Sequence, residues 1–141
     1  MLETIPGRHM PTFVVAAGVL VQDGRVLLTQ RKPGTHQALS WEFPGGKVEE
    51  GEDPRNALAR ELREEIAVLA VVGDVIDVTF HRYSDHSVLL IFYAVSLAPG
   101  SPPPRPVDIA DFRWAASRDL GEMELSPADR AVVNRVRRLL P

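Results

Sequence analysis

The stretch DPRNALARELREEI, residues 53–66, places the strongest constraint on the fold. Asp53 is a residue type that caps the first turn of a helix, and Pro54 suits the first helical position. Three apolar residues recur at every fourth position: Leu58, Leu62 and Ile66. This spacing predicts an amphipathic helix, and its apolar stripe must be buried against another element of the fold.

Three glutamates share one flank of this predicted helix. With Leu58 at zero and about 100° per residue, Glu65 falls at about −20°, Glu61 at about −60° and Glu64 at about −120°. Like charges this close destabilise a helix unless a cation compensates them. Arg60 can pair with Glu64, but one guanidinium leaves most of the charge unmatched. A hard divalent cation would resolve the conflict, and a solvated acidic face is the alternative interpretation.

Strand patterns flank the helix on both sides. TFVVAAGVLVQDGRVLLTQR, residues 12–31, predicts two strands joined at Asp-Gly, which is a strong hairpin signal. Residues 68–97 are rich in β-branched and aromatic residues and break at RYSDHS, residues 82–87, which predicts a second hairpin. DFRWAA, residues 111–116, predicts a further short strand.

The remaining segments are predicted loops and a closing helix. Residues 32–40 form a loop, and APGSPPPRP, residues 98–106, is compatible with loop or polyproline II. SPADRAVVNRVRRLL, residues 126–140, predicts a helix with Ser126 as N-cap and Pro127 in its first turn. Strands before and between two helices favour the α/β (α+β) class, with a mixed sheet and helices on its faces.

The composition narrows the choice of partners and location. With 141 residues, we expect one domain over residues 11–141 and a tail over residues 1–10, disordered or partly left from cloning. A net charge of −3 argues against duplex nucleic acid as a partner, and the absence of cysteine excludes thiolate metal sites. No apolar run approaches the roughly 20 residues that cross a bilayer, and the N-terminus lacks a signal-peptide pattern. We therefore expect a cytoplasmic protein, monomeric or homodimeric, that does not enter the membrane.

A longer motif encloses the acidic helix and resembles the signature of the Nudix hydrolases. The matching residues, in order and spacing, are Gly46, Glu52, Arg60, Glu61, Leu62, Glu64, Glu65 and Val68. One position departs, because Ala67 stands where the family has glycine. If this residue adopts a left-handed conformation, alanine costs about 1 kcal/mol of stability relative to glycine.

WEFPGGK, residues 41–47, extends the resemblance to the MutT-like nucleoside triphosphate pyrophosphohydrolases. The resemblance implies an α/β/α sandwich and a Mg²⁺- or Mn²⁺-dependent enzyme that converts a nucleoside triphosphate, including 8-oxo-dGTP, CTP or modified dNTPs, to a monophosphate and pyrophosphate. Alternatives are hydrolysis of another nucleoside diphosphate derivative (ADP-ribose, a dinucleoside polyphosphate or an RNA 5′ end) and a nucleotide-binding domain without catalysis. An interaction domain with an acidic surface is a further alternative. The Pro-Gly-Gly sequence is expected to be a flexible turn that lets the backbone approach metal and phosphates.

The resemblance assigns roles to the residues of the motif. The metal ligands would be Glu61, Glu64, Glu65 and the carbonyl of Gly45, and Arg60 would orient the glutamates by charge-assisted hydrogen bonds. The base that takes the proton of the attacking water would be a glutamate of the motif, Glu61 or Glu64, or an acid from a later loop. Asp108, six residues before Trp114, is the candidate in that loop, with an Asx turn as the alternative.

Further residues align with nucleotide-contacting positions of MutT-like enzymes. Arg31 and His36 would contact the nucleotide, or be a solvated arginine and a loop histidine. Phe43 would form a wall of the base pocket or belong to the core. Glu42 would face the nucleotide or solvent.

Asp129 aligns with the asparagine by which MutT reads 8-oxoguanine. An ionised aspartate only accepts hydrogen bonds, which favours bases with an exocyclic amine, cytosine or adenine, along with oxidised guanine. The alternative is structural, because Ser126 and Asp129 fit the start of a capped helix.

Overall fold

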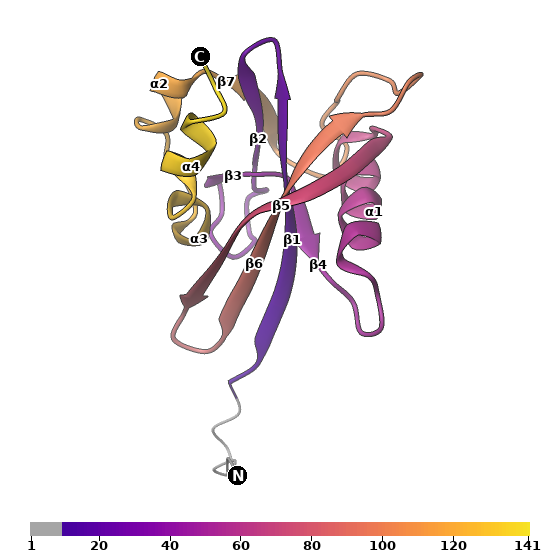
Figure 1. Cartoon of the computed structure of the whole chain (residues 1–141). Coiled ribbons are helices and arrows are strands. Elements are labelled where there is room, and N and C mark those ends of the chain that lie inside the picture. The colour runs from indigo at the N-terminus through magenta and orange to yellow at the C-terminus, as the bar shows by residue number, and fades with distance from the viewer. Residues whose placement is uncertain (1–9) are drawn as a thin grey trace.

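The computed structural model describes residues 10–141. The predicted tail therefore lies outside the described residues, except for Met10. A seven-stranded mixed sheet lies between helix α1 (Pro54–Ile66) on one face and three short helices on the other, as Figure 1 shows. This arrangement confirms the predicted α/β/α sandwich. Within the described residues, no helix has the length and hydropathy of a membrane span.

Both predicted hairpins are present. Strands β1 (Thr12–Gln22) and β2 (Arg25–Gln30) are antiparallel, and the Asp-Gly pair between them has positive φ at both residues. Strands β5 (Ala70–Arg82) and β6 (Ser87–Leu97) form the second hairpin. The two hairpins join through a parallel pairing of β1 with β6, which makes the sheet mixed.

Three shorter strands complete the sheet. β3 (Trp41–Glu42) and β7 (Asp111–Ala115) both pair with β2, and β4 (Gly45–Lys47) pairs antiparallel with β1. The expectation of a flexible Pro-Gly-Gly turn is wrong, because both glycines lie in β4. The pairing with β1 supplies the backbone hydrogen-bonding partners that hold this segment extended.

Helix α1 forms as its sequence predicts. The Asp53 carboxylate accepts hydrogen bonds from the Arg55 N–H at 2.8 Å and the Asn56 N–H at 3.3 Å. The apolar stripe is fully buried against β1 and its neighbours, with Leu58, Leu62 and Ile66 all at 0% exposure. Ala67 ends the helix in the left-handed conformation, with φ 59° and ψ 35°.

The prediction of a single closing helix is wrong. The C-terminal region contains α2 (Ser117–Leu120), which was not predicted, α3 (Pro127–Arg130) and α4 (Val133–Arg137). The chain between α3 and α4 tightens to i→i+3 hydrogen bonds where the adjacent residues Val132 and Val133 are both buried. Valine is also a weaker helix former than unbranched residues, so little local preference opposes this break.

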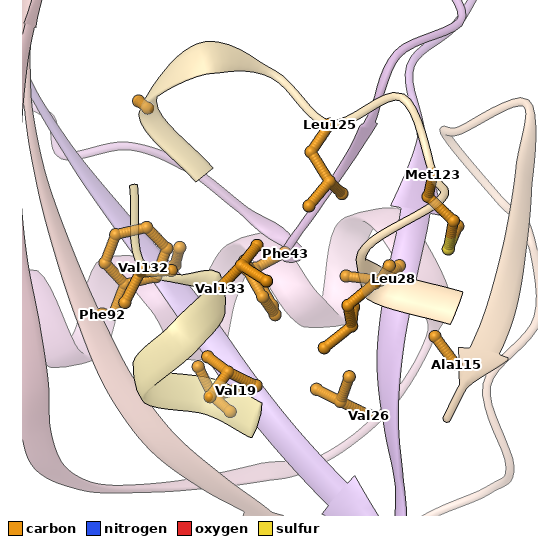
Figure 2. Packing of buried hydrophobic residues seen from close by; sticks show 14 of the residues in the cluster. Val19, Val26, Leu28, Phe43, Phe92, Ala115, Met123, Leu125, Val132 and Val133 are labelled. Carbon is orange, nitrogen blue, oxygen red and sulfur yellow. The ribbon is translucent and has the colours of Figure 1, made fainter. Parts of the chain in front are cut away.

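Ser126 does not act as the predicted N-cap, since its side chain makes no capping hydrogen bond. Its backbone N–H donates instead to the Trp41 carbonyl at 3.0 Å, which ties the start of α3 to β3. The apolar side chains of α3 and α4 then cover the second face of the sheet. Figure 2 shows Val132 and Val133 close to Phe43 and Phe92 in this cluster.

The left-handed alanine at the end of α1 generates a stability prediction. We expect Ala67→Gly to raise the free energy of unfolding by about 0.5 to 1 kcal/mol, because glycine adopts positive φ without a Cβ clash. Urea unfolding measures the change. The matched control is Ala59→Gly inside the same helix, where glycine should lower stability by about 1 kcal/mol. Equal losses in both variants would contradict the assignment of strain to Ala67.

Candidate active site

The two glycines of β4 allow close contacts on two sides, Gly46 with helix α1 and Gly45 with strand β1. A Cβ atom on Gly46 would overlap the carboxyl group of Glu61, and one on Gly45 would overlap the backbone oxygen of Ala16 in β1. Gly45 also has φ 156°, a conformation that other residues rarely adopt. Close packing therefore explains why glycine occupies both positions, and the sequence alone did not reveal this reason.

Arg60 holds the acidic flank of α1 in place. Its Nε and Nη2 atoms donate to the two carboxylate oxygens of Glu52, each at 2.9 Å, and Nη1 donates to Glu61 at 3.0 Å and Glu64 at 3.3 Å. Hydrogen bonds from Arg60, and from the Glu49 backbone, lower the pKa of Glu52 to about 2. Glu52 therefore stays ionised and fixes the guanidinium that donates to Glu61.

Glu65 is a buried carboxyl group without a compensating partner. The residue is 9% exposed, and its Oε1 atom has no hydrogen-bond partner among residues 10–141. Burial raises its pKa to about 9, and the nearby charges of Glu42, Glu61 and Asp108 act in the same direction. Such a group needs either a proton or a cation.

The loop after β6 places Asp108 beside Glu65. The backbone N–H groups of Val107 and Asp108 both donate to the Glu65 carbonyl, at 3.0 and 3.1 Å, and the Arg105 N–H donates to the Ile66 carbonyl. These bonds satisfy carbonyls that the end of α1 leaves free. The Asp108 carboxylate is 63% exposed and accepts a hydrogen bond from Lys32 Nζ at 2.6 Å.

These groups meet in a polar cavity of about 310 Å³, which we call the acidic cavity. Its lining includes Gly45, Glu61, Glu65, Asp108, Arg31 and Lys32. The predicted ligand Glu64 is not in this lining; its side chain is 54% exposed and bonded to Arg60. Over residues 10–141, no three acidic or histidine side chains are already gathered as a metal shell. The donor set of carboxylates and a carbonyl, with the unpartnered Glu65 oxygen, nevertheless fits a hard divalent cation.

A second cavity of about 540 Å³ adjoins the first and shares Arg31, Glu42, Gly45 and Glu61 with it. We call it the aromatic pocket, because rings from four segments line it: Phe13, His36, Phe43, Tyr83 and His86. Phe43 is 2% exposed and meets Phe92 edge to face, so it belongs to the core and also forms a wall of this pocket. The volume lies within the range of small-molecule sites.

Asp129 lies in the aromatic pocket and not at a helix cap. It is 4% exposed, and its Oδ1 atom accepts a hydrogen bond from the Phe43 N–H at 3.0 Å. Burial raises its pKa well above the ordinary value, and the charge of Glu42 adds to the effect. The expectation that Asp129 only accepts hydrogen bonds assumes an ionised carboxylate, and a raised pKa favours the neutral carboxyl group, which also donates.

Arg31 and Glu42 line both cavities, and His36 lines the aromatic pocket. Arg31 Nη1 forms an ion pair with Glu42 at 3.2 Å, and its Nε donates to the His36 carbonyl. Burial raises the pKa of Glu42 to about 6, with Arg31 acting in the opposite direction. The His36 ring packs edge to face on Tyr83 and His86, with centroids 4.8 and 5.3 Å apart. All three predicted residues therefore line the aromatic pocket.

Sequence reasoning missed Lys32, Tyr83 and His86. Tyr83 and His86 belong to the turn of the second predicted hairpin, but the parallel pairing of β6 with β1 that brings this turn to the pocket has no local signal. Lys32 directly follows Arg31, a predicted nucleotide contact. Its positive charge next to that residue was a sequence signal that could have identified it as a site residue.

Comparisons with known proteins agree with this geometry. A family model described as NUDIX domain matches residues 12–136. The chain is 35% identical over 123 residues to an 8-oxo-dGTP diphosphatase of Haemophilus influenzae, covering 86% of this chain and 89% of that protein. It is 49% identical over 65 residues to a CTP pyrophosphohydrolase of Escherichia coli, covering 46% of this chain and 48% of that protein.

A solved structure shows the same fold. The solution structure of the E. coli ORF135 protein superposes with a TM-score of 0.78 at 32% identity, covering 92% of this chain and 91% of that one. The family match spans the sheet, the acidic helix and both cavities. The chain therefore belongs to the NUDIX domain family, which confirms the family that its acidic helix motif predicted.

Proposed function

We propose that this chain is a Mg²⁺-dependent hydrolase that converts nucleoside triphosphates to the monophosphate and pyrophosphate. The observation that carries the proposal is the junction of the acidic cavity, with its unpartnered Glu65 carboxyl, and the aromatic pocket. A nucleotide fits two adjoining cavities of this kind, because its polyphosphate and its flat base extend from the same sugar. The relatives named 8-oxo-dGTP diphosphatase and CTP pyrophosphohydrolase support this reaction class.

The motif residues would hold the metal and the phosphates. Glu61, Glu65 and Gly45 line the acidic cavity, and the two carboxylates with the Gly45 carbonyl would bind Mg²⁺ or Mn²⁺. Glu64 would join them after its hydrogen bond with Arg60 breaks. A bound cation would neutralise charge on the phosphate oxygens and lower the pKa of an attacking water. Arg60, locked by Glu52, would keep Glu61 directed at the site.

Asp108 is our candidate for the base that takes the proton from the water. Its carboxylate lines the acidic cavity, and its backbone is fixed to the carbonyl of Glu65. Glu64 is less suitable in this arrangement, because it is bonded to Arg60 and is not part of the cavity lining. To serve as a base, a carboxylate must be ionised and lie within hydrogen-bonding reach of the water.

Asp129 would read the base in the aromatic pocket. Its Oδ1 is engaged by the Phe43 N–H, so the proton of the neutral carboxyl group would lie on Oδ2. A neutral acid presents one donor and retains acceptor capacity, as an asparagine does. Asp129 would therefore bind a base edge that carries an acceptor and a donor side by side, which oxidised guanine provides as well as cytosine or adenine. Phe43 and Tyr83 would contact the ring or the sugar.

The direct test is a hydrolysis panel with Mg²⁺. It contains the canonical NTPs and dNTPs, 8-oxo-dGTP, ADP-ribose, a dinucleoside polyphosphate and a 5′-triphosphorylated RNA. We expect a nucleoside monophosphate and pyrophosphate from one or more triphosphates. Turnover of ADP-ribose or the dinucleoside polyphosphate alone would replace the proposal with the corresponding diphosphatase. Tight nucleotide binding with no hydrolysis of any compound would indicate a domain without catalysis.

The metal assignment predicts a linked loss of stability and activity in Glu65→Gln. Mg²⁺ at about 100 times its Kd adds about 2.7 kcal/mol to the unfolding free energy of the unsubstituted chain. The substitution should remove most of this increment, measured in thermal melts with and without EDTA, and lower kcat by about 10- to 100-fold. Glu50→Gln, on the exposed surface, is the matched control and should retain both. An unchanged Mg²⁺ response in Glu65→Gln would show that the metal binds elsewhere.

The raised pKa of Asp129 predicts a pH-dependent stability. Its folded pKa is raised, so below about pH 4 both folded and unfolded states hold the proton, and the buried carboxyl group is tolerated. As the pH rises from the unfolded pKa of about 4 toward the raised folded pKa, the unfolded state loses the proton first and the free energy of unfolding falls. Asp129→Asn does not titrate, so its stability relative to the unsubstituted chain should increase by up to about 1.4 kcal/mol per pH unit.

Urea unfolding at several values between about pH 4 and pH 7 measures this difference. Asp74→Asn, on the exposed surface of β5, is the matched control and should follow the unsubstituted chain. Parallel curves for Asp129→Asn and the unsubstituted chain would show that Asp129 is ionised in the folded protein at neutral pH.

A further inference from the structure

Lys32 connects two loops across the mouth of the acidic cavity. It follows the end of β2, and its Nζ donates to Asp108 Oδ1 at 2.6 Å, a contact between residues 76 positions apart. Both side chains line the cavity that contains Glu61 and Glu65. The ammonium group therefore lies at the site where the proposed function places the phosphates.

The backbones on both sides of this contact are fixed, whereas the side chains are not. The Lys32 carbonyl accepts a hydrogen bond from Thr35 Oγ1 at 2.6 Å, and the adjacent Arg31 N–H donates to the Ser40 carbonyl. Asp108 is anchored through its N–H to Glu65. The Lys32 side chain is 50% exposed, so its four-carbon stem can change direction while both loops stay in place.

The two arginines near the cavity are already committed to other groups. Arg31 binds Glu42 and the His36 carbonyl, and Arg60 binds Glu52, Glu61 and Glu64. Lys32 has one ion pair, with an exposed carboxylate, and exposed pairs of this kind contribute little to stability. Among these cations, Lys32 can therefore change partner at the lowest cost.

We propose that Lys32 binds the terminal phosphates of the nucleotide and that Asp108 holds it in their absence. The proposal rests on the proposed function, since it assumes a polyphosphate in the acidic cavity. A phosphate oxygen offers the ammonium group a stronger charge-assisted hydrogen bond than a solvated carboxylate does. Exchange of partners also frees the Asp108 carboxylate inside the cavity. Lys32 is thus a substrate-binding residue whose partner in the ligand-free protein is the candidate base.

The assignment predicts an effect confined to polyphosphates. In Lys32→Met, the affinity for inorganic pyrophosphate with Mg²⁺ should fall by about tenfold or more, measured by calorimetry, because a hydrogen bond to a charged group is lost. Affinity for GMP should stay within about twofold, since a monophosphate does not reach the terminal subsite. Lys32→Arg should restore most of the pyrophosphate affinity, and Arg135→Met, on the exposed surface of α4, should change neither.

A double-substitution cycle tests the exchange of partners. Asp108→Asn removes the competing carboxylate, so pyrophosphate should bind more tightly to this variant than to the unsubstituted chain. In the Lys32→Met background, Asp108→Asn should have no such effect. If Asp108→Asn changes pyrophosphate affinity equally in both backgrounds, or if Lys32→Met leaves it unchanged, the proposal is overturned. Absence of pyrophosphate binding by the unsubstituted chain overturns it as well.

The outcome is separable from that of the proposed function. If Lys32→Met selectively weakens pyrophosphate binding but no triphosphate is hydrolysed, the Lys32 site stands and the catalytic proposal fails. If triphosphates are hydrolysed and Lys32→Met changes neither pyrophosphate affinity nor KM, the catalytic proposal stands and the Lys32 site is wrong. In Lys32→Met, the KM for the triphosphate should rise by a larger factor than the factor by which kcat falls.

Discussion

The site depends on the close approach of α1 to β4. The Glu61 carboxylate occupies the space that a side chain at position 46 would fill, so glycine at this position lets the carboxylate keep its place against the strand. The apolar stripe of α1 supplies the driving force for docking, and the Arg60 contacts with Glu52 and Glu61 fix the rotation of the acidic flank. Together these contacts put helix carboxylates and the strand segment containing the Gly45 carbonyl into one cavity.

The same packing produces a charge conflict that the fold does not resolve by itself. Glu65 is buried next to Glu42, Glu61 and Asp108, and its pKa is raised mainly by burial. A chain under selection for stability alone would be served better by an apolar residue at this position, because a buried unpaired carboxyl destabilises the folded state. Apolar residues on the same helix, Leu62 and Ile66, are fully buried next to this position. Glu65 is therefore best explained by a ligand that compensates its charge.

Much of the fold follows from local signals, and the parts that do not are set by contacts between distant residues. The cap at Asp53, the stripe of α1 and the Asp-Gly turn are encoded within a few residues each, and the motif spacing placed Arg60 beside its glutamates. The break after α3 and the raised pKa of Asp129 were not predictable in this way. The pKa of Asp129 is raised because the residue is buried beside Phe43 and near Glu42, residues more than 80 positions earlier in the chain.

Residues 42–46 couple the two cavities through one short segment. Glu42 lines both cavities, the Phe43 N–H holds Asp129, and Gly45 and Gly46 accommodate the backbone of β1 and the carboxylate of Glu61. A base bound near Asp129 and phosphates bound near Glu61 would therefore be positioned by the same stretch of backbone. The side chains that would select the base come from other segments, the loop at His36, the turn at Tyr83 and the start of α3. Substitutions in those segments can change the shape of the aromatic pocket without moving α1 against β4, which allows base preference to vary while the hydrolytic arrangement is retained.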